Sequence, residues 1–385
     1  MRVLFLEPGD FLRTPRKTNP YLDPIIDVCE KNGIDWEIWM PSRKTVNGYG
    51  PVHVKSYGTF HFVHNVIYRF FACLLCVSKQ RANRWAAHIS GKYILKPLLS
   101  RHGVPNLIIS LSGFLVEDLY YGFPHVRAID VQHGVIYSRH SGYFDKNRRL
   151  WPLYWCDGFM NREFWVYGQG FANCFLEHPD NVKDLQGRVK IIGDVIRAGE
   201  YNRDGAVECG SEEVRNVVVF SAQLTADLTR EEMAASVKRM EEFFDEFFKK
   251  FGDRYECLVK HHPRFANLYD MTGFFAKFPQ LKETKEQWAE LYPRMVLHVT
   301  FMSTVTFDCA SAGVPTYLLD FPAAKILKRD LFRNDYAYPY FDKTVEEILA
   351  IPTEEARKTM MEWYRKFYAP FDEKNCLRLL RGEGD

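Results

Sequence analysis

The feature that most constrains the fold is a series of short, apolar, β-branched runs that each end in small or polar residues. In the first half of the chain these runs lie at residues 3–6, 36–39, 107–111, 128–131, 164–167 and 189–192. Each is typical of a buried strand. Helical patterns fall between them, at 24–31 and 65–98. Strands that alternate with helices indicate a parallel α/β sheet, so the first half is predicted to form one doubly wound domain.

The same alternation returns after a polar segment, 194–216, whose composition suits a linker. Predicted strands lie at 217–220, 255–259, 295–299 and 316–319, and predicted helices at 230–251, 286–291, 304–312, 345–350 and 354–368. A chain of 385 residues that is 46% apolar can bury two cores. We therefore predict an α/β protein with Rossmann-like domains at 1–200 and 211–365, a C-terminal segment at 366–385, and ligands outside the carboxyl ends of the strands in a shared cleft.

Charge and cysteine usage restrict the partners and the compartment. The net charge of +2 gives no reason to expect the basic face that duplex nucleic acid requires, so no nucleic-acid partner is expected. The nine cysteines are scattered without a disulfide-type spacing, which indicates a reducing compartment. The apolar start of the chain is only five residues long and runs into Glu7, unlike a signal peptide. We expect a cytoplasmic protein.

The most apolar segment, 60–77, is interrupted by His61, His64, Asn65 and Arg69 and falls short of a membrane span. Two interpretations stay open. The favoured one is a face that packs between helices in the core. The alternative is a helix that lies on the cytoplasmic face of the inner membrane near a lipid-linked acceptor, as a peripheral contact.

The clearest sign of chemistry is a strand that runs into a helix, in the segment HVTFMSTVTFDCASAGVP. A helix N-terminus offers unpaired N–H groups and the positive end of the helix dipole, and hydroxyl groups there can cap the helix or bind a phosphate oxygen. Ser303 and Thr304 are the candidates for the phosphate, and Asp308 is assigned a supporting position one turn further on. The alternative for Ser303 is an ordinary N-cap.

A second segment of this kind is LVKHHPR, where a strand runs into Lys260, His262 and Arg264. Pro263 restricts the preceding residue to an extended conformation, which ends the strand and presents the imidazole at its carboxyl edge. Cationic side chains at such an edge favour an anionic ligand, although a surface cluster is the alternative. Ser221 and Gln223 end the first strand of the same domain and are further donor-binding candidates.

Metal and cofactor are not expected. The sequence contains no D-x-D triplet, and its histidines lack a zinc-type spacing. Cationic side chains and helix N–H groups would have to neutralise a leaving nucleotide instead.

In the first domain the segment AIDVQHGVIYSRHSGY follows a strand. Gly134 lets the chain turn sharply while His133 is presented as a general base toward an acceptor hydroxyl. Gln132, His140 and Tyr143 are the neighbouring candidates for acceptor binding. The alternative for His133 is acceptor binding or a structural hydrogen bond.

Two carboxylates are rival catalytic bases. Asp10 follows the first strand, and Glu117 follows Ser112 and Gly113. Both lie where an inverting enzyme can keep its catalytic acid residue, and Asp10 is the stronger rival.

KHHPR, followed some forty residues later by TFMSTVTFD, resembles the paired HP and TDYSSVxFD signatures of the CDP-glycerol glycerophosphotransferases and, more distantly, of capsular Kdo transferases and bacterial polysialyltransferases. The QHG segment is similar to their HG motif, and the terminal PFDEKNCLRLL to their tail. The resemblance implies a GT-B fold, a C-terminal helix that crosses back to the first domain, donor-phosphate contacts by His262, Ser303 and Thr304, and His133 as base.

The sequence departs from that signature where Phe301 and Met302 replace its Asp-Tyr pair. We therefore predict transfer of a sugar, from a nucleotide-sugar donor to a hydroxyl of a glycan or lipid-linked glycan in bacterial capsule or lipopolysaccharide synthesis. The reaction would be metal-independent and inverting. Alternatives are a polyol-phosphate transferase, a UDP-sugar 2-epimerase and a non-catalytic glycan- or nucleotide-binding protein.

Overall fold

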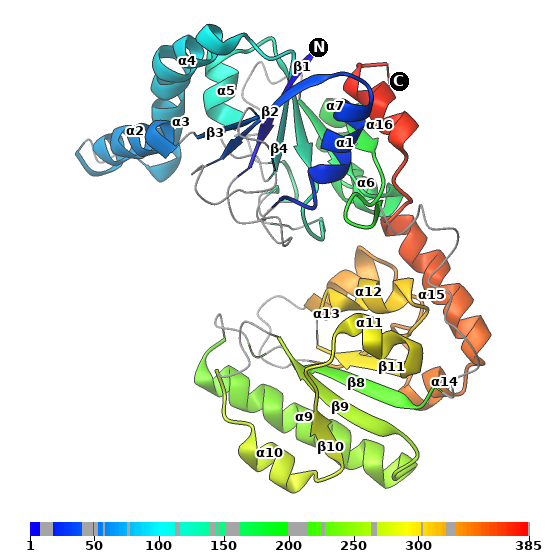
Figure 1. The fold of residues 1–385 in the computed structure, drawn as a ribbon. Coiled ribbons are helices and arrows are strands. Elements are labelled where there is room, and N and C mark those ends of the chain that lie inside the picture. The colour runs from blue at the N-terminus through cyan, green and yellow to red at the C-terminus, as the bar shows by residue number, and fades with distance from the viewer. Residues whose placement is uncertain are drawn as a thin grey trace. The chain divides into compact units, whose positions relative to one another are not determined.

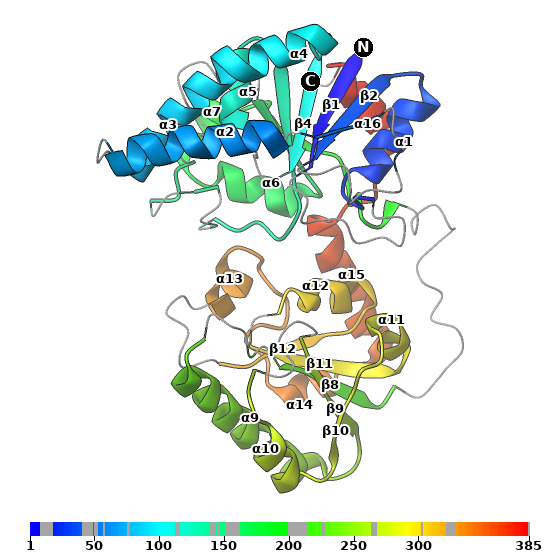
Figure 2. The ribbon, with the colours of Figure 1, turned by 60° about the vertical axis from the view of Figure 1, so that its left-hand side comes forward.

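The computed structural model divides into two compact units, a first unit made of Met1–Arg203 with Tyr368–Asp385 and a second unit made of Asp204–Phe367. Each unit holds one parallel sheet with helices on its faces (Figures 1 and 2). The structure describes residues 1–7, 18–40, 49, 53–56, 58–74, 78–111, 116–138, 140, 143–144, 147–150, 162–198, 215–222, 224, 228–262, 268–301, 303–320 and 328–383. Within these ranges no helix has the length and apolarity needed to cross a bilayer.

The first unit contains a seven-stranded parallel sheet in the order β3-β2-β1-β4-β5-β6-β7. Its strands are β1 (Arg2–Leu6), β2 (Asp35–Met40), β3 (Val54–Ser56), β4 (Leu107–Leu111), β5 (Arg127–Val131), β6 (Arg162–Val166) and β7 (Val189–Ile191). All five residues of β4 are buried, as expected for a central strand covered on both faces. The six predicted strands are confirmed, whereas β3 was missed because it carries no apolar run.

The helices of the first unit follow the strands along the chain. They are α1 (Asp23–Lys31), α2 (Gly58–Arg69), η2 (Phe70–Leu74), α3 (Lys79–Ser90), η3 (Gly91–Leu95), α4 (Lys96–His102), α5 (Val116–Gly122), α6 (Gln169–Leu176), α7 (Pro179–Leu185) and α16 (Glu373–Leu380). The prediction of a single helix over 65–98 is wrong. The chain reverses there, so that α2 and α3 pack side by side (Figure 1), and η2 and η3 are π-helical. Both helices have the same apolar period, so the reversal left no trace in the sequence pattern.

The second unit contains a five-stranded parallel sheet in the order β10-β9-β8-β11-β12. Its strands are β8 (Val217–Ala222), β9 (Glu256–His261), β10 (Leu281–Glu283), β11 (Met295–Thr300) and β12 (Thr316–Leu318). Its helices are α9 (Arg230–Phe251), α10 (Thr272–Lys277), α11 (Trp288–Leu291), η5 (Tyr292–Arg294), α12 (Val305–Ser311), α13 (Lys328–Asn334), α14 (Val345–Leu349) and α15 (Thr353–Phe367).

The longest helix of the second unit, α9, covers one face of its sheet with aromatic side chains. Phe243 and Phe244 lie with their ring centroids 6.1 and 5.7 Å from that of Phe220 in β8. On the other face, Val219 and Leu258 pack with Cys309 of α12 in a buried cluster. These two apolar layers hold the strands in place.

The C-terminal segment returns to the first unit. Asp372 caps α16 by accepting hydrogen bonds from Lys374 N and Asn375 N. The amide of Asn375 donates to the carbonyl of Ile191 at 3.0 Å, and Arg127 Nη1 donates to the carbonyl of Leu380 at 3.1 Å. The predicted return of the C-terminal helix to the N-terminal domain is thereby confirmed.

Candidate functional site

The predicted donor residues gather at one edge of the five-stranded sheet. Strands β9, β8, β11 and β12 are neighbours and run parallel, so their carboxyl ends share that edge. Ser221 of β8 pairs with Lys260 on one side and with Thr300 on the other. His262 follows β9 directly, and Ser303 follows Thr300 by three residues. The two sequence segments, KHHPR and FMSTVTFD, therefore lie at the same edge of the sheet, on either side of the end of β8.

Ser303 turns the chain from β11 into α12. Its side chain is buried, its Oγ accepts a hydrogen bond from Val305 N at 3.2 Å, and its N donates to Thr300 Oγ1 at 3.3 Å. Thr304 is exposed, occupies the N-cap position, and makes no capping hydrogen bond with its side chain. Ser303 thus fixes the turn, and the exposed hydroxyl is that of Thr304.

A hydroxyl that the sequence analysis did not single out lies in the first turn of α12. Thr306 is completely buried, and within the described residues its Oγ1 has no hydrogen-bond partner. Leaving a buried hydroxyl unsatisfied costs about 1–3 kcal/mol. Nothing in the segment STVTFD distinguishes this threonine from a core residue, because its burial depends on packing.

The two histidines of KHHPR face different surroundings. His262 is exposed just past the end of β9. His261 lies on the opposite face of the strand, since successive residues alternate. Its Nε2 is 3.9 Å from Glu283 Oε1, its ring lies 6.5 Å from that of Phe275, and burial lowers its pKa. Arg264 and Gln223 lie outside the described residues.

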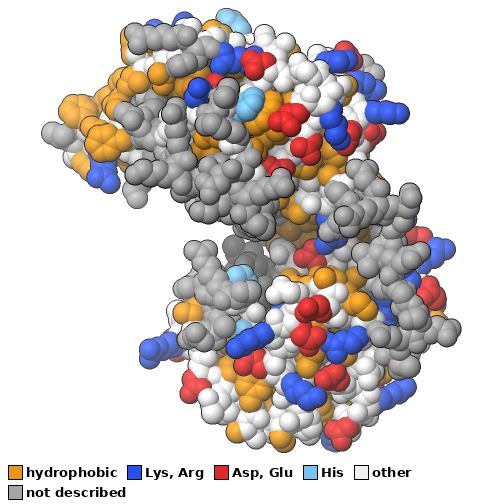
Figure 3. Space-filling model, viewed as in Figure 1, with side chains coloured by type: hydrophobic (Ala, Val, Ile, Leu, Met, Phe, Trp, Pro, Cys, Tyr) orange, Lys and Arg blue, Asp and Glu red, His pale blue; other side chains and the backbone are white. Residues whose placement is uncertain are grey.

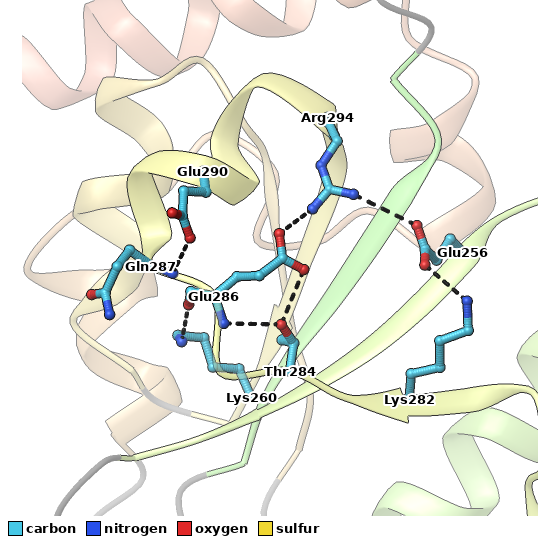
Figure 4. Close-up of polar contacts among 8 residues, drawn as sticks. All are labelled: Glu256, Lys260, Lys282, Thr284, Glu286, Gln287, Glu290 and Arg294. Carbon is cyan, nitrogen blue, oxygen red and sulfur yellow. Dashed lines mark hydrogen bonds and ion pairs between the residues drawn. The ribbon is translucent and has the colours of Figure 1, made fainter.

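Lys260 has a partner inside the second unit. Figure 4 shows its Nζ donating to the carbonyl of Glu286, in the loop that leads into α11. The ammonium also lies 5.5 Å from the ring centroid of Trp288, and burial lowers its pKa. Thr284 and Arg294 hold the carboxylate of Glu286 in the same network. The lysine therefore holds this loop at the edge of the sheet. Its position in KHHPR did not indicate this structural contact.

Ser221 is likewise engaged within the sheet. Its Oγ lies 2.7 Å from Nε2 of His298, whose Nδ1 lies 3.0 Å from Thr316 Oγ1. Both hydroxyls and the ring are buried. Desolvation lowers the pKa of His298 to about 3, so the ring is neutral and one of its nitrogens donates while the other accepts. The only sign of these linked side chains in the sequence is a histidine inside the apolar strand MVLHVT.

In the first unit the loop after β5 is fixed by Gln132. This side chain is buried, accepts a hydrogen bond from Tyr167 N at 2.9 Å, and donates to the carbonyl of Gly134 at 2.7 Å. The phenol of Tyr167 donates to the carbonyl of Gln132 at 2.6 Å. Gln132 therefore positions the loop that carries His133, and its polar atoms are occupied in doing so.

Around that loop the structure brings together three of the predicted acceptor-side residues. The ring of His140 lies 5.0 Å from that of Tyr137 and 5.3 Å from that of Tyr143. The pKa of His140 is lowered by burial and, to a smaller extent, by the nearby His133. Gly134 is exposed, with open space where a side chain would stand. The arrangement is a pair of imidazoles beside aromatic rings at the carboxyl end of a strand.

Of the rival bases, Asp10 lies outside the described residues, and Glu117 lies in the first turn of α5. A carboxylate that sequence reasoning missed is Glu7, which is completely buried directly after β1 and accepts a hydrogen bond from Asn19 Nδ2. It follows a strand as Asp10 does, but its burial could not be foreseen from the sequence LEPGD.

In the described parts of the chain, no group of three or more His, Cys, Asp or Glu side chains is placed to hold a metal ion. Binding of a donor without metal or cofactor stays a prediction.

No protein-family model matches the chain, and no curated protein sequence matches it. Several solved structures, in contrast, are similar to it. An O. sativa protein in complex with UDP and deoxynivalenol-3-glucoside is similar with a TM-score of 0.55 at 9% identity, over 100% of both chains. The N-terminal domain of Candida albicans trehalose-6-phosphate phosphatase is similar with a TM-score of 0.53 at 11% identity, over 99% of this chain and 96% of that one.

A third similar structure is UDP-GlcNAc 2-epimerase from Methanocaldococcus jannaschii, with a TM-score of 0.49, 13% identity and 99% of both chains covered. At these identities a likeness shows the fold alone. The two parallel sheets and the likeness over the whole chain show that the fold is α/β of the GT-B class.

Proposed function

We propose that this protein is a glycosyltransferase, which moves a sugar from a nucleotide-sugar donor to a hydroxyl of a glycan or lipid-linked glycan. The observation that carries the proposal is the sheet edge where His262, Ser303 and Thr304 follow the two strands, β9 and β11, that flank β8. Ligands of open α/β sheets bind outside the carboxyl ends of the strands. The reaction would serve surface polysaccharide synthesis.

In this proposal the second unit binds the donor. The exposed imidazole of His262 and the exposed hydroxyl of Thr304 contact the diphosphate. Lys260 and Ser221 act indirectly, because both are already bonded inside the unit. Charge that develops on the departing diphosphate is stabilised by these donors without a metal.

The first unit activates the acceptor. His133 accepts the proton of the acceptor hydroxyl as its oxygen attacks the anomeric carbon, and the bond from that carbon to the diphosphate breaks. Direct displacement inverts the configuration at that carbon. Gln132 and Gly134 hold the loop in position, and Tyr143 and His140 line its side. General base catalysis of this kind contributes typically 10²–10⁴-fold to the rate.

The proposal predicts that a nucleotide stabilises the chain and that two histidine variants separate binding from transfer. A thermal-shift series with CMP, CDP, UDP, GDP and dTDP identifies the nucleotide, because a ligand that binds only the folded state raises its stability. His262→Ala should abolish the shift. His133→Ala should keep it and lower transfer by about 10²–10⁴-fold.

The matched control for the donor site is His261→Gln, which changes the neighbouring residue on the opposite face of β9. It should keep the nucleotide shift. A His262→Ala protein that still bound nucleotide would overturn the donor-site assignment. Turnover of a nucleotide sugar without any acceptor would indicate a UDP-sugar 2-epimerase, and transfer from CDP-glycerol would indicate a polyol-phosphate transferase.

A further inference from the structure

The acidic residues of this chain are distributed very unevenly. The sequence has 51 Lys and Arg and 49 Asp and Glu, yet neither Asp nor Glu occurs between Glu37 and Glu117. The helices α2 to α4 lie within this acid-free stretch and carry Arg69, Lys79, Arg81, Arg84, Lys92, Lys96 and Arg101. A near-neutral chain therefore contains a strongly cationic helical stretch, α2 to α4, which begins with the α2–α3 hairpin and continues through η3.

The same hairpin exposes large apolar side chains. Phe62, Val66 and Phe70 are 68%, 50% and 49% exposed, which is unusual for residues of this size. They are spaced four apart along α2 and into η2, so they form one stripe on the same side. The favoured prediction that this segment packs in the core is wrong for these three residues.

The stripe extends onto the second helix of the hairpin. The ring of Phe71 packs against those of Phe70 and Trp85, with centroids 5.5 and 5.0 Å apart. Trp85 is 42% exposed and Tyr93, in η3, is 64% exposed. Figure 3 shows hydrophobic side chains gathered over the end of the hairpin, at the left of the view.

Cations lie among these apolar groups. Arg69, Lys92 and Lys96 are exposed, and Lys92 Nζ lies 5.5 Å from the ring centroid of Tyr93. Among the described residues no ion pair is formed by these three side chains, in agreement with the absence of nearby acids in the sequence. Helices α2 to α4 contain no carboxylate that could neutralise their charge.

Buried polar contacts fix the hairpin to the first unit. Asp118 of α5 accepts hydrogen bonds at its Oδ1 from Ser90 Oγ at 2.6 Å and from His64 Nδ1 at 2.7 Å, and all three residues are buried. A side chain at Gly91 would overlap the backbone of Asp118. The exposed stripe is thus presented by a helix pair that is held in one position.

We propose that the α2–α3 hairpin docks onto the surface of an anionic phospholipid bilayer. Its aromatic and aliphatic stripe enters the boundary between headgroups and acyl chains, and its lysines and arginines contact the acidic headgroups. A soluble polyanion would satisfy the cations but would leave Phe62, Val66 and Phe70 in water. The surface shares no residue with the donor or acceptor sites, so this inference does not depend on the proposed function.

The test is cosedimentation of the full chain with vesicles of phosphatidylcholine alone and of phosphatidylcholine mixed with phosphatidylglycerol. Binding to the mixed vesicles is expected, with a loss of at least tenfold for Phe62→Ser with Phe70→Ser. The control is Ile196→Ser with Leu268→Ser, which removes two apolar residues of similar exposure, 47% and 45%, that are not part of the hairpin. It should bind as the parent does.

The charge component is tested with Arg69→Gln combined with Lys92→Gln. Each removed cation should weaken binding to the anionic vesicles on the order of fivefold, which corresponds to ~1 kcal/mol for a basic residue near such a surface. Lys358→Gln with Lys366→Gln, two exposed lysines of α15, is the matched control. All variants change exposed residues, and their melting temperatures establish that they fold.

Two results would overturn the proposal. One is equal vesicle binding by the parent and by the hairpin variants. The other is binding of the parent to heparin or duplex DNA with no binding to vesicles, which would identify a soluble polyanion as the partner. Loss of the nucleotide shift with vesicle binding retained would contradict only the proposed function.

Discussion

His298 lies in an environment that its residue type seldom occupies. It lies in β11 with no exposed surface, between the hydroxyls of Ser221 and Thr316. Burial holds its pKa at about 3 instead of 6.5, so the folded chain takes up a proton at this ring less readily than the unfolded chain. Stability supplied by the neutral ring is present above pH 6.5 and is lost as the pH falls toward 3.

We therefore predict that the free energy of unfolding of the second unit falls by about 2 kcal/mol between pH 7.5 and pH 5 through this residue, since one proton corresponds to about 1.36 kcal/mol per pH unit. His298→Gln should remove that contribution from the pH slope. Urea unfolding at several pH values measures it. A variant with the parent's slope would show that His298 keeps its protonation state on unfolding.

The positions of residues in the candidate site were predictable where they depend on strand ends, whereas their roles stay predictions. His262 and Ser303 were found because an apolar run stops beside them, and parallel strands end at a common edge. The contact made by Lys260 could not be predicted from the sequence. Its partner is the carbonyl of Glu286, which lies 26 residues further along the chain. Similarly, the pattern around Gln132 did not reveal that Tyr167 occupies its side chain.

Among the elements, α9 is the one whose bounds the sequence defined best. Thr229 accepts a hydrogen bond from Glu232 N at 3.2 Å, and the carboxylate of Glu232 accepts one from Thr229 N at 2.8 Å. Gly252, with φ of +55°, ends the helix. Both signals are local, and the helix has the bounds that were predicted for it, 230–251. The α2–α3 hairpin was predicted as one helical pattern, although Ser78, directly before α3, is a residue type that often begins a helix.

The capping box gives a direct stability prediction. Thr229→Ala should lower the free energy of unfolding of the second unit by about 1 kcal/mol, because the N–H of Glu232 loses its partner. Thr229→Ser keeps the hydroxyl and should cost much less. Chemical denaturation of the two variants measures the difference. Equal stability of the alanine and serine variants would contradict the capping role.

At the scale of the whole molecule, the first unit is built from two separate stretches of chain. Asp194 N donates to the carbonyl of Ala369 at 2.7 Å, and Ala369 N donates to that of Tyr167 at 3.0 Å. Gly193 has a φ of +90°, and a side chain there would overlap the backbone of Pro370 and Phe371. Through these contacts the C-terminal segment, 368–385, packs against the seven-stranded sheet.

Gly193→Ala is accordingly predicted to loosen α16 from the first unit. Hydrogen exchange should accelerate in α16, α1 and β7 and stay unchanged in β8 and β9. Gly187→Ala is the control, because Gly187 also has a positive φ, +73°, but has open space around it. Gly187→Ala should lower the free energy of unfolding only by the cost of placing alanine in a left-handed backbone conformation, roughly 1–2 kcal/mol. Equal effects of the two substitutions would show that the contact with Pro370 and Phe371 does not hold the segment.

The return of residues 368–385 also has a consequence for how the chain is made. The second unit, Asp204–Phe367, is continuous in sequence, so all of its residues are synthesised, and leave the ribosome, ahead of α16. Synthesis of the first unit begins earlier, but the unit lacks α16 until the whole second unit has been synthesised. Until then the sides of β7 and α1 that contact α16 are uncovered. Of the two units, the one translated later is thus the first that can be completed, which reverses the usual N-to-C order of domain folding.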